Sequence, residues 1–136
     1  MDDCLFCKII EEDMPSAKIY EDKDTFAFLD INPVNPGHTL VVPKKHYRNI
    51  FDIPEETLCD MIQTAKKLAK AVKEATGSDG INIGISNEKA AGQEIFHIHI
   101  HIIPRFQGDG FKHWPGTPYK EGVAETIAGK IRSELT

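Results

Sequence analysis

The stretch over residues 96–103, FHIHIHII, constrains the fold more than any other part of this sequence. Histidine and isoleucine alternate within it, and side chains two residues apart share one face of a β-strand. The sequence therefore predicts a strand here, with its isoleucines turned towards a core and its histidines on the opposite, open face. A merely solvated face would more often carry Thr, Lys or Glu, so we expect the imidazoles to have a function. The two sets are Ile98, Ile100 and Ile102, and His97, His99 and His101.

The spacing of the three histidines limits how they could bind a metal. Neighbouring members lie about 6.7 Å apart along a strand, so two of the imidazoles could hold one ion. The outer pair lies about 13 Å apart, near the limit that two His–metal bonds can span. Three ligands to one zinc ion are therefore not expected, and the row must serve at least two purposes.

The remaining segments predict an α+β fold. Residues 53–77 show the clearest helical pattern, with Pro54 in the first turn, apolar residues at spacings of three and four, and Gly77 at the end. The other elements do not alternate as βαβ units. We therefore expect a five-stranded antiparallel sheet, one long helix and short terminal helices. The other expected strands are residues 17–22, 25–30, 38–43 and 79–86, the expected loop is 31–37, and the short helices are 4–13 and 119–136.

Composition sets the general class of the protein. A length of 136 residues fits a single domain, 1–136, and the formal net charge of −5 argues against nonspecific nucleic-acid binding, which needs a basic patch. No apolar run approaches the roughly 20 residues that span a bilayer, and the acidic N-terminus does not resemble a signal peptide. We therefore expect a cytoplasmic protein with neither nucleic acid nor membrane as partner. Its three cysteines are not expected to form a disulfide framework.

Cys4 and Cys7 form a CxxC pair near the N-terminus. Such a pair needs two further ligands to complete a tetrahedral zinc site. A thioredoxin-like redox pair is the alternative, but that motif follows a strand, and no strand fits before residue 4. A Cys2His2 site that uses both cysteines, His46 and one end of the histidine row is physically reasonable.

Several motifs together resemble the histidine triad (HIT) family. HIHIHII at residues 97–103 matches the family's His-x-His-x-His-hydrophobic-hydrophobic signature, and GQEIFH at 92–97 resembles the approach to it. Residues 26–46 look like the nucleotide-binding hairpin of the family, and CLFCKII at 4–10 resembles the start of its bacterial members. The resemblance covers a core of residues 4–105 and leaves a tail, 106–136, for which a role in the dimer or at the substrate site is expected.

The resemblance implies a HIT-like fold, a homodimer and a purine nucleotide as substrate. In such proteins the middle histidine, here His99, attacks the α-phosphate and forms a transient nucleotidyl-histidine, and a neutral imidazole suits that role. His101 and Gln93 would balance the phosphate charge as further catalytic residues. The long helix and the fourth strand are the expected dimer interface. The resemblance implies nucleotide-binding roles for Phe6, Ile9, Phe28, Asp30, Ile31, His38, Asn87, Gly92, Gln93, His99 and His101.

A zinc-bearing branch of the family uses the first triad histidine as a ligand. By resemblance, this assigns Cys4, Cys7, His46 and His97 to a zinc ion. Because the protein fills all four positions and leaves none for water, the zinc would be structural.

One residue departs from the family pattern, and a short segment lies beyond the part of the chain that matches it. Glu94 stands where members usually carry Ser or Thr, which puts the leaving-group donor in doubt, and Glu94→Ser is predicted to alter substrate preference. His113 and Trp114 resemble a segment that reaches the partner's active site in phosphoramidase relatives. Hydrolysis of a nucleoside phosphoramidate or adenylylated amine is the leading function. A dinucleoside polyphosphate hydrolase and a non-catalytic nucleotide-binding adaptor are the alternatives.

Overall fold

The computed structural model describes residues 3–135. Its five strands form one antiparallel sheet in the order β1-β2-β3-β5-β4, and the predicted α+β fold with one long helix and short terminal helices is confirmed. The expected hairpin is formed by β1 and β2. The elements are α1 (Leu5–Ile10), β1 (Lys18–Glu21), β2 (Thr25–Leu29), β3 (Thr39–Pro43), α2 (Glu55–Thr76), β4 (Gly80–Gly84), the 3₁₀ turn η1 (Lys89–Ala91), β5 (Ile100–Arg105) and α3 (Val123–Glu134).

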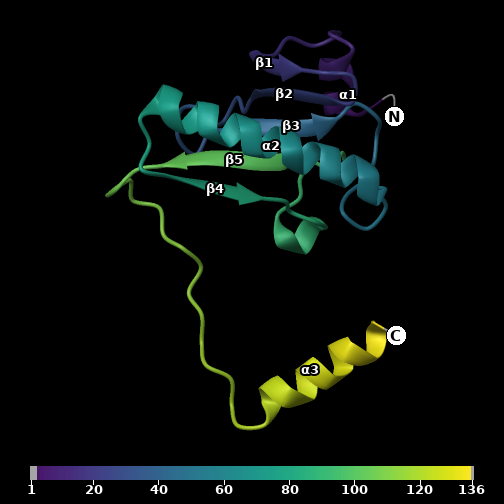
Figure 1. The fold of residues 1–136 in the computed structure, drawn as a ribbon, viewed down its shortest axis with the longest axis vertical. Helices are drawn as coiled ribbons and strands as arrows, with labels where there is room; N and C mark the ends of the chain where they lie inside the picture. Colours follow the sequence, from purple (N-terminus) through teal and green to yellow (C-terminus); the bar gives the residue numbers. More distant parts are fainter. Residues whose placement is uncertain (1–2, 136) are drawn as a thin grey trace.

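The sheet carries a core on each face. The long helix α2 crosses one face, where its buried side chains pack against Ala27, Val41 and the isoleucines of the histidine row (Figure 1). On the other face α1 contributes Phe6 and Ile9 to a second, smaller core. Alternate residues of β2 and β3 point to opposite cores, as the two-residue period of a strand requires. The smaller core also contains Phe26, Phe28, Leu40 and Val42.

The ends of α2 follow the predicted signals. Pro54 directly precedes the helix, and Gly77 follows it with φ +67°, a left-handed conformation that glycine adopts without strain. Met61, Ala65, Leu68 and Val72 form its buried stripe, whereas Ile62, which shares the predicted pattern, is 47% exposed. The apolar stripe is therefore wider than the surface that the sheet covers.

The fifth strand begins later than predicted. The sequence predicts a strand over 96–103, but β5 runs from Ile100 to Arg105. The partner strand β3 ends at Pro43, which has no N–H to extend the ladder, so the chain over 96–99 loses its regular partner. The main-chain N–H of Ile98 donates instead to the carbonyl of Tyr47 at 2.8 Å. His97 and His99 are thus held by contacts other than the sheet ladder.

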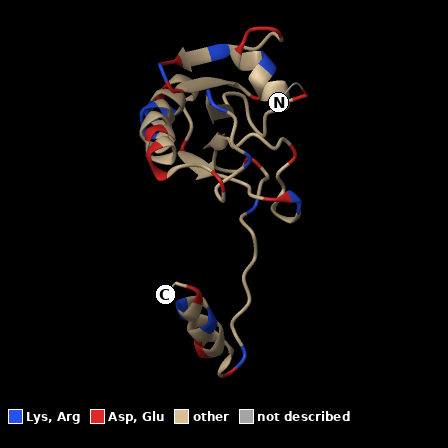
Figure 2. Cartoon of the chain, turned by 90° about the vertical axis from the view of Figure 1, so that its right-hand side faces the viewer, with Lys and Arg blue, Asp and Glu red and all other residues tan. Residues whose placement is uncertain are grey.

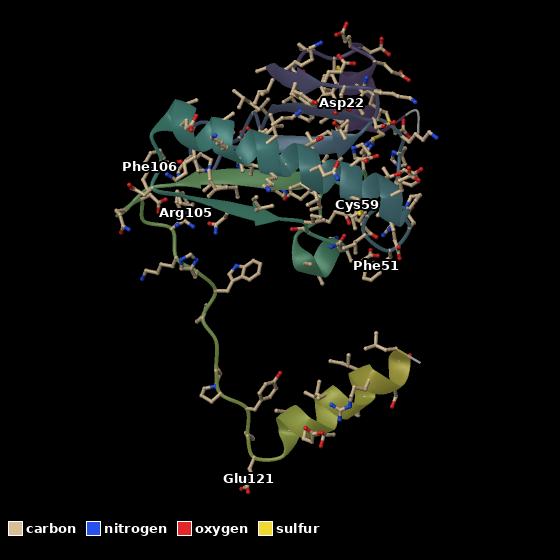
Figure 3. All side chains as sticks on the ribbon, viewed as in Figure 1. Asp22, Phe51, Cys59, Arg105, Phe106 and Glu121 are labelled. Atoms are coloured by element: carbon tan, nitrogen blue, oxygen red, sulfur yellow. The ribbon has the colours of Figure 1, made fainter. Side chains whose placement is uncertain are left out.

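The chain after β5 leaves the body of the molecule as an extended arm that ends in α3 (Figure 1). Arg105 and Phe106 mark the point of departure, and Glu121 marks the turn before α3 (Figure 3). None of the described residues of α3 is buried. Both signs of charge mix on α2 and on α3 (Figure 2). Within residues 3–135, no helix combines the length and the hydropathy of a membrane span.

Candidate functional site

The three histidines share the α1 side of the sheet, away from the isoleucines that face α2, as the alternation predicts. The face is not open, however. His97 is fully buried and His99 is only 8% exposed, because Phe6 of α1 places its ring edge-on against both imidazoles. The expectation of an open face was wrong because a short helix covers it. The covering changes the chemistry of the rings, since burial favours neutral imidazole.

The contacts of His99 determine which of its nitrogens is reactive. Its Nδ1 lies 2.9 Å from the main-chain oxygen of His97. Because a carbonyl oxygen only accepts, Nδ1 carries the proton and Nε2 of the neutral ring carries a lone pair. Burial lowers the pKa of His99 below its usual value, which keeps this lone pair free near neutral pH. Nε2 of His99 therefore carries the free lone pair that a nucleophile would need.

His101 is oriented by a chain of two hydrogen bonds. The N–H of Val34 donates to Nδ1 of His38 at 3.1 Å, which fixes the proton of neutral His38 on Nε2. That nitrogen lies 2.9 Å from Nδ1 of His101 and donates to it. The proton of His101 is therefore on its own Nε2, where the ring can donate a hydrogen bond to a ligand. The structure thus places His38 directly behind His101.

Burial keeps both rings of this chain neutral. It lowers the pKa of His101 to about 4, with the neighbouring His99 and His38 adding to the effect. The pKa of His38 is also lowered by burial, although the Asp30 carboxylate 3.7 Å away opposes the shift. At neutral pH the two rings therefore relay a hydrogen bond without carrying charge.

Cys4, Cys7, His46 and His97 form a compact cluster at the other end of the row. Their donor atoms all lie within 4.8 Å of one another. Nδ1 of His97 lies 3.4 Å from Sγ of Cys4 and 3.5 Å from Sγ of Cys7, and Nδ1 of His46 lies 3.4 Å from Sγ of Cys7. Zinc–sulfur and zinc–nitrogen bonds at the tetrahedral angle place S and N about 3.5 Å apart. The measured separations suit one zinc ion.

The protonation of these donors also suits a metal. Nε2 of His97 donates to the carbonyl of Pro43 at 2.8 Å, which leaves the lone pair on Nδ1, the atom that faces the two sulfurs. Burial raises the pKa of Cys7 to about 11, and the adjacent Cys4 thiol adds to it. In the metal-free protein this thiol is protonated, so zinc binding must release its proton.

Asp30, His38 and His101 form a second cluster whose donor atoms lie within 4.8 Å of one another. Its hydrogen bonds do not suit a metal. Because Nδ1 of His38 accepts from the Val34 N–H, the Nε2 that faces the cluster must carry a proton in the neutral ring and cannot offer a lone pair. We therefore read the second cluster as a hydrogen-bond relay.

Gln93, predicted to contact the phosphate, is occupied elsewhere in the structure. Its side chain is 2% exposed, and its amide NH₂ donates to the carbonyls of Arg48 and Ile95 at 2.7 and 3.1 Å. Its oxygen accepts from the N–H of Glu88 and from Asn49 Nδ2 at 2.9 and 3.2 Å. An amide has two protons and two lone pairs, and all four are used. In this arrangement the Gln93 amide positions the chain, and its contact with a phosphate stays a prediction.

The predicted nucleotide-binding residues fall into different environments. Phe6, Ile9 and Phe28 are buried in the smaller core, and of these Phe6 contacts the His99 ring at 5.1 Å between centroids. Asp30 is partly buried beside His38, and Ile31 is 84% exposed. Phe6 therefore contacts the ring of His99, His38 contacts His101, and Asp30 lies 3.7 Å from His38. The assignment of Ile9, Phe28 and Ile31 to the base stays a prediction.

Asn87 and Gly92 lie on the turn before the histidine row. The side-chain oxygen of Asn87 accepts from the N–H of Ile50 at 2.8 Å, and Gly92 has φ +95° at the end of η1. Glu94 is exposed and lines a surface cavity with Cys4 and His46, on the side of the metal cluster. The predicted effect of Glu94 on the leaving group is untested by this placement.

Four groups that organise the site could not be recognised from the sequence. The carbonyl of Pro43 and the N–H of Val34 act through the main chain, where residue type carries no signal. Asn49, which is 1% exposed, and Glu88 brace the turn before the row. Glu88 has φ +76° and ψ +158°, a region nearly restricted to glycine, at a cost of about 1–3 kcal/mol. Its exposed ion pair with Arg48 contributes little to stability.

The sequence matches a known domain family and several known proteins. The family model described as "HIT domain" matches residues 11–108. The protein named "Protein hit" from Bacillus subtilis is 46% identical over 138 residues, 98% of this chain and 95% of that protein. Adenosine 5'-monophosphoramidase HNT1 of Saccharomyces cerevisiae is 47% identical over 133 residues, 97% of this chain and 80% of that protein.

Solved structures agree with the fold. A crystal structure of a Streptococcus mutans protein superimposes with a TM-score of 0.94 at 42% identity, and the match covers 100% of this chain and 87% of that one. A zinc-bound histidine triad family protein from Mycobacterium smegmatis superimposes with a TM-score of 0.78 at 37% identity and 98% coverage of both chains.

Proposed function

The chain belongs to the HIT domain family, and from this premise we propose that it hydrolyses purine nucleotide derivatives at the α-phosphate through a covalent intermediate on His99. The observation that carries the proposal is the pair of oriented rings. Nε2 of His99 bears a free lone pair, and Nε2 of His101 bears a proton because His38 donates to its Nδ1. One ring can attack phosphorus while the other donates to a phosphate oxygen.

In the first step, Nε2 of His99 forms a bond to the α-phosphorus as the bond to the leaving group breaks. The imidazole then carries a positive charge, and Nδ1–H donates to the carbonyl of His97, which stabilises that charge. An amine leaving group takes up a proton from solvent and departs, and the water that attacks in the second step returns a proton to solvent. In the second step water attacks the same phosphorus, the N–P bond breaks, and nucleoside monophosphate and free His99 result.

A nucleoside phosphoramidate or another adenylylated compound is the substrate class we favour. The relative from Saccharomyces cerevisiae carries the name of an adenosine monophosphoramidase. A relative from Arabidopsis thaliana, 45% identical over 107 residues, is named an adenylylsulfatase. Both names describe cleavage beside an adenylyl phosphate, which supports this class over a role in nucleotide binding alone.

Cys4, Cys7, His46 and His97 would hold a structural zinc ion. The donor separations and the free Nδ1 of His97 support this assignment, as does the existence of a zinc-bound relative. Zinc bound there would supply structural cross-linking of α1 to the segment before β5, since the ligands fill its coordination. The catalytic steps use only the other two histidines of the row.

A homodimer is part of the same proposal. The edge strand β4 leaves Ile83 50% exposed, and Ile62 on α2 is 47% exposed, so the two predicted interface elements offer apolar surface. Light scattering would contradict the dimer if it gave the mass of a single 15.2 kDa chain.

The test is turnover of adenosine phosphoramidate beside a diadenosine polyphosphate, with wild type and His99→Ala. We expect the phosphoramidate to be the better substrate and the alanine variant to lose on the order of 10⁴-fold in kcat or more. Equal activity of His99→Ala would refute the nucleophile. A wild type that binds AMP but turns over neither compound would favour the adaptor. Preference for the diadenosine compound would favour the polyphosphate hydrolase.

A further inference from the structure

The turn that leads into the histidine row contains a residue in a conformation that suits glycine. Glu88 has φ +76° and ψ +158°, and it is followed by η1 and by Gly92 at φ +95°. The carbonyl of Glu88 accepts from the N–H groups of Ala91 and Gln93 at 3.0 and 3.2 Å, so this backbone conformation closes the turn. A glycine could close it without strain. The presence of a side chain at this position therefore needs an explanation other than the backbone.

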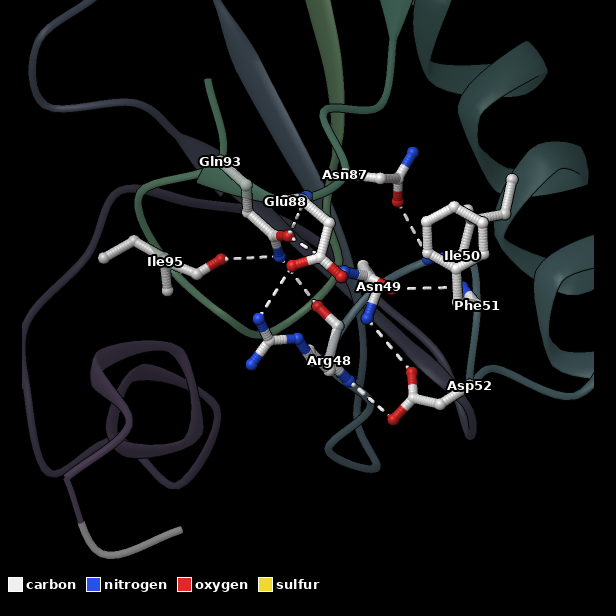
Figure 4. Close-up of polar contacts among 9 residues, drawn as sticks. All are labelled: Arg48, Asn49, Ile50, Phe51, Asp52, Asn87, Glu88, Gln93 and Ile95. Atoms are coloured by element: carbon white, nitrogen blue, oxygen red, sulfur yellow. Dashed lines mark hydrogen bonds and ion pairs between the residues drawn. The ribbon is translucent and has the colours of Figure 1, made fainter. Parts of the chain in front are cut away.

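The Glu88 carboxylate is clamped on both oxygens. Oε1 accepts from Arg48 Nη2 at 2.7 Å and Oε2 accepts from Asn49 Nδ2 at 3.2 Å (Figure 4). The Arg48 guanidinium also lies over the Phe96 ring, 4.4 Å from its centroid. Asp52 fixes the other side of the clamp, because its carboxylate accepts from the N–H groups of Arg48 and Asn49 at 3.0 Å each. The segments 48–52 and 87–95 are thus joined through Glu88.

This junction lies where the sheet gives no support. The strand β5 begins only at Ile100, and the chain before it is tied to the 47–49 segment by Ile98 N–H to Tyr47 and by Gln93 to Arg48. The Gln93 oxygen accepts from both the Glu88 N–H and Asn49, so it shares the same clamp. The position of the approach to His97 and His99 therefore depends on the alignment of these two segments.

We propose that Glu88 is a positioning residue that, through Arg48 and Asn49, holds the 87–93 turn and the start of the histidine row in the geometry of phosphoryl transfer. The inference rests on the proposed function for its chemistry. An exposed ion pair contributes little to stability, so this pair does not compensate for the strained backbone at Glu88. We therefore attribute the strain to the defined geometry of the turn. Loss of the clamp would leave the fold intact and the phosphate misplaced against His99 Nε2, which lowers kcat strongly.

The experiment compares Glu88→Gly, Glu88→Ala and Glu88→Gln with Glu21→Ala as a matched control. Glu21, on the edge strand β1, forms an ion pair with Lys44 at 2.7 Å, the same length as the pair of Glu88 with Arg48. We measure kcat and KM on adenosine phosphoramidate, the melting temperature, and amide exchange over residues 88–93. Glu88→Gly and Glu88→Ala should each lose about 10- to 100-fold in kcat and show faster exchange. Glu88→Gln, which keeps a hydrogen-bonding side chain, should recover most of the loss.

The two short substitutions separate strain from clamping. Glu88→Gly should melt at a higher temperature than Glu88→Ala, the reverse of the usual order. Both variants keep a positive φ at this position, but only alanine is strained by it. The control should change neither kcat nor exchange over 88–93. The proposal would be overturned if Glu88→Gly kept the kcat and the amide exchange of wild type. It would also be overturned if the loss of kcat equalled the fraction of the variant that is unfolded. If wild type itself failed to turn over the phosphoramidate, the function would be wrong. The clamp would then be tested by amide exchange over residues 88–93 and by affinity for AMP. Values in the Glu88 variants that equal those of wild type would overturn the proposal.

Discussion

His97 and His101 lie four residues apart on one side of the chain, and each joins a cluster of histidine with sulfur or carboxylate donors. In both clusters the ligand-type side-chain atoms lie within 4.8 Å of one another. They differ in the partner of the second ring nitrogen. In His97 that partner is a carbonyl, which takes the proton and frees a lone pair for a metal. Behind His101 the partner of His38 is an N–H, which occupies the lone pair and leaves a proton facing the cluster.

The comparison shows that a main-chain atom decides what a buried imidazole can bind. Proximity of three or four ligand-type side chains does not identify a metal site unless the protonation of each ring also permits it. We call the cluster of Cys4, Cys7, His46 and His97 the metal end of the row, and the cluster of Asp30, His38 and His101 the relay end. The two ends should therefore respond differently to substitution, metal removal and acid.

The largest difference is expected from removing a ligand at the metal end. Cys7→Ser should abolish stoichiometric zinc and lower the melting temperature by roughly 10 °C or more, because metal binding contributes to folding. Metal analysis and calorimetry measure both. Cys59→Ser is the control, since this cysteine is exposed on α2 and should change neither quantity. Unaltered zinc content in Cys7→Ser would refute the ligand set.

A smaller effect is expected at the relay end. His38→Phe keeps an aromatic ring but removes the donor to Nδ1 of His101, so that ring is free to adopt the wrong tautomer. We expect kcat on adenosine phosphoramidate to fall about 10- to 100-fold, while zinc content stays at one ion per chain. Steady-state kinetics and metal analysis of the same preparation test this. Lost zinc in His38→Phe would show that the two ends are not independent.

The smallest effect is the acid sensitivity of the relay. Burial lowers the pKa of His101 to about 4 and also lowers that of His38, with Asp30 opposing and His99 reinforcing the shift. Their stabilising contribution is thus full above the unfolded pKa of about 6.5 and falls as pH drops towards 4. Each group adds at most about 1.4 kcal/mol per pH unit in this window. Urea unfolding at pH 7.5, 6 and 5 measures it, and His38→Phe should show a shallower decline. An equal slope in the variant would contradict the assignment.

The fold was largely predictable because its signals are local. Strict alternation identified the face of each histidine, and Pro54 and Gly77 bounded α2 to within a residue or two. The start of β5 was not predictable, since it depends on where the partner strand ends at Pro43. The projection of α3 away from the body was also not predictable, because its weak apolar pattern at Val123, Ile127 and Ile131 indicates a helix but not what it contacts.

The histidines and cysteines of the candidate site could be located from the sequence, and the groups that support them could not. The histidine row and the CxxC pair are visible because their residue types are uncommon at that spacing. Gln93 was assigned to phosphate by resemblance, yet its amide is used by carbonyls 45 and 2 residues away in the chain. Glu88 carries no sequence signal at all, since its φ and its clamp exist only after the two loops have met.

The hydrogen bond from His97 to Pro43 shows how far the position of this ring depends on the two cysteines. The match to the family begins at residue 11, beyond both cysteines. Because the Pro43 carbonyl orients the His97 ring from within the sheet, that orientation does not depend on Cys4 or Cys7. A chain with His97 but without the two cysteines would keep this hydrogen bond while lacking the sulfur donors of the proposed metal site.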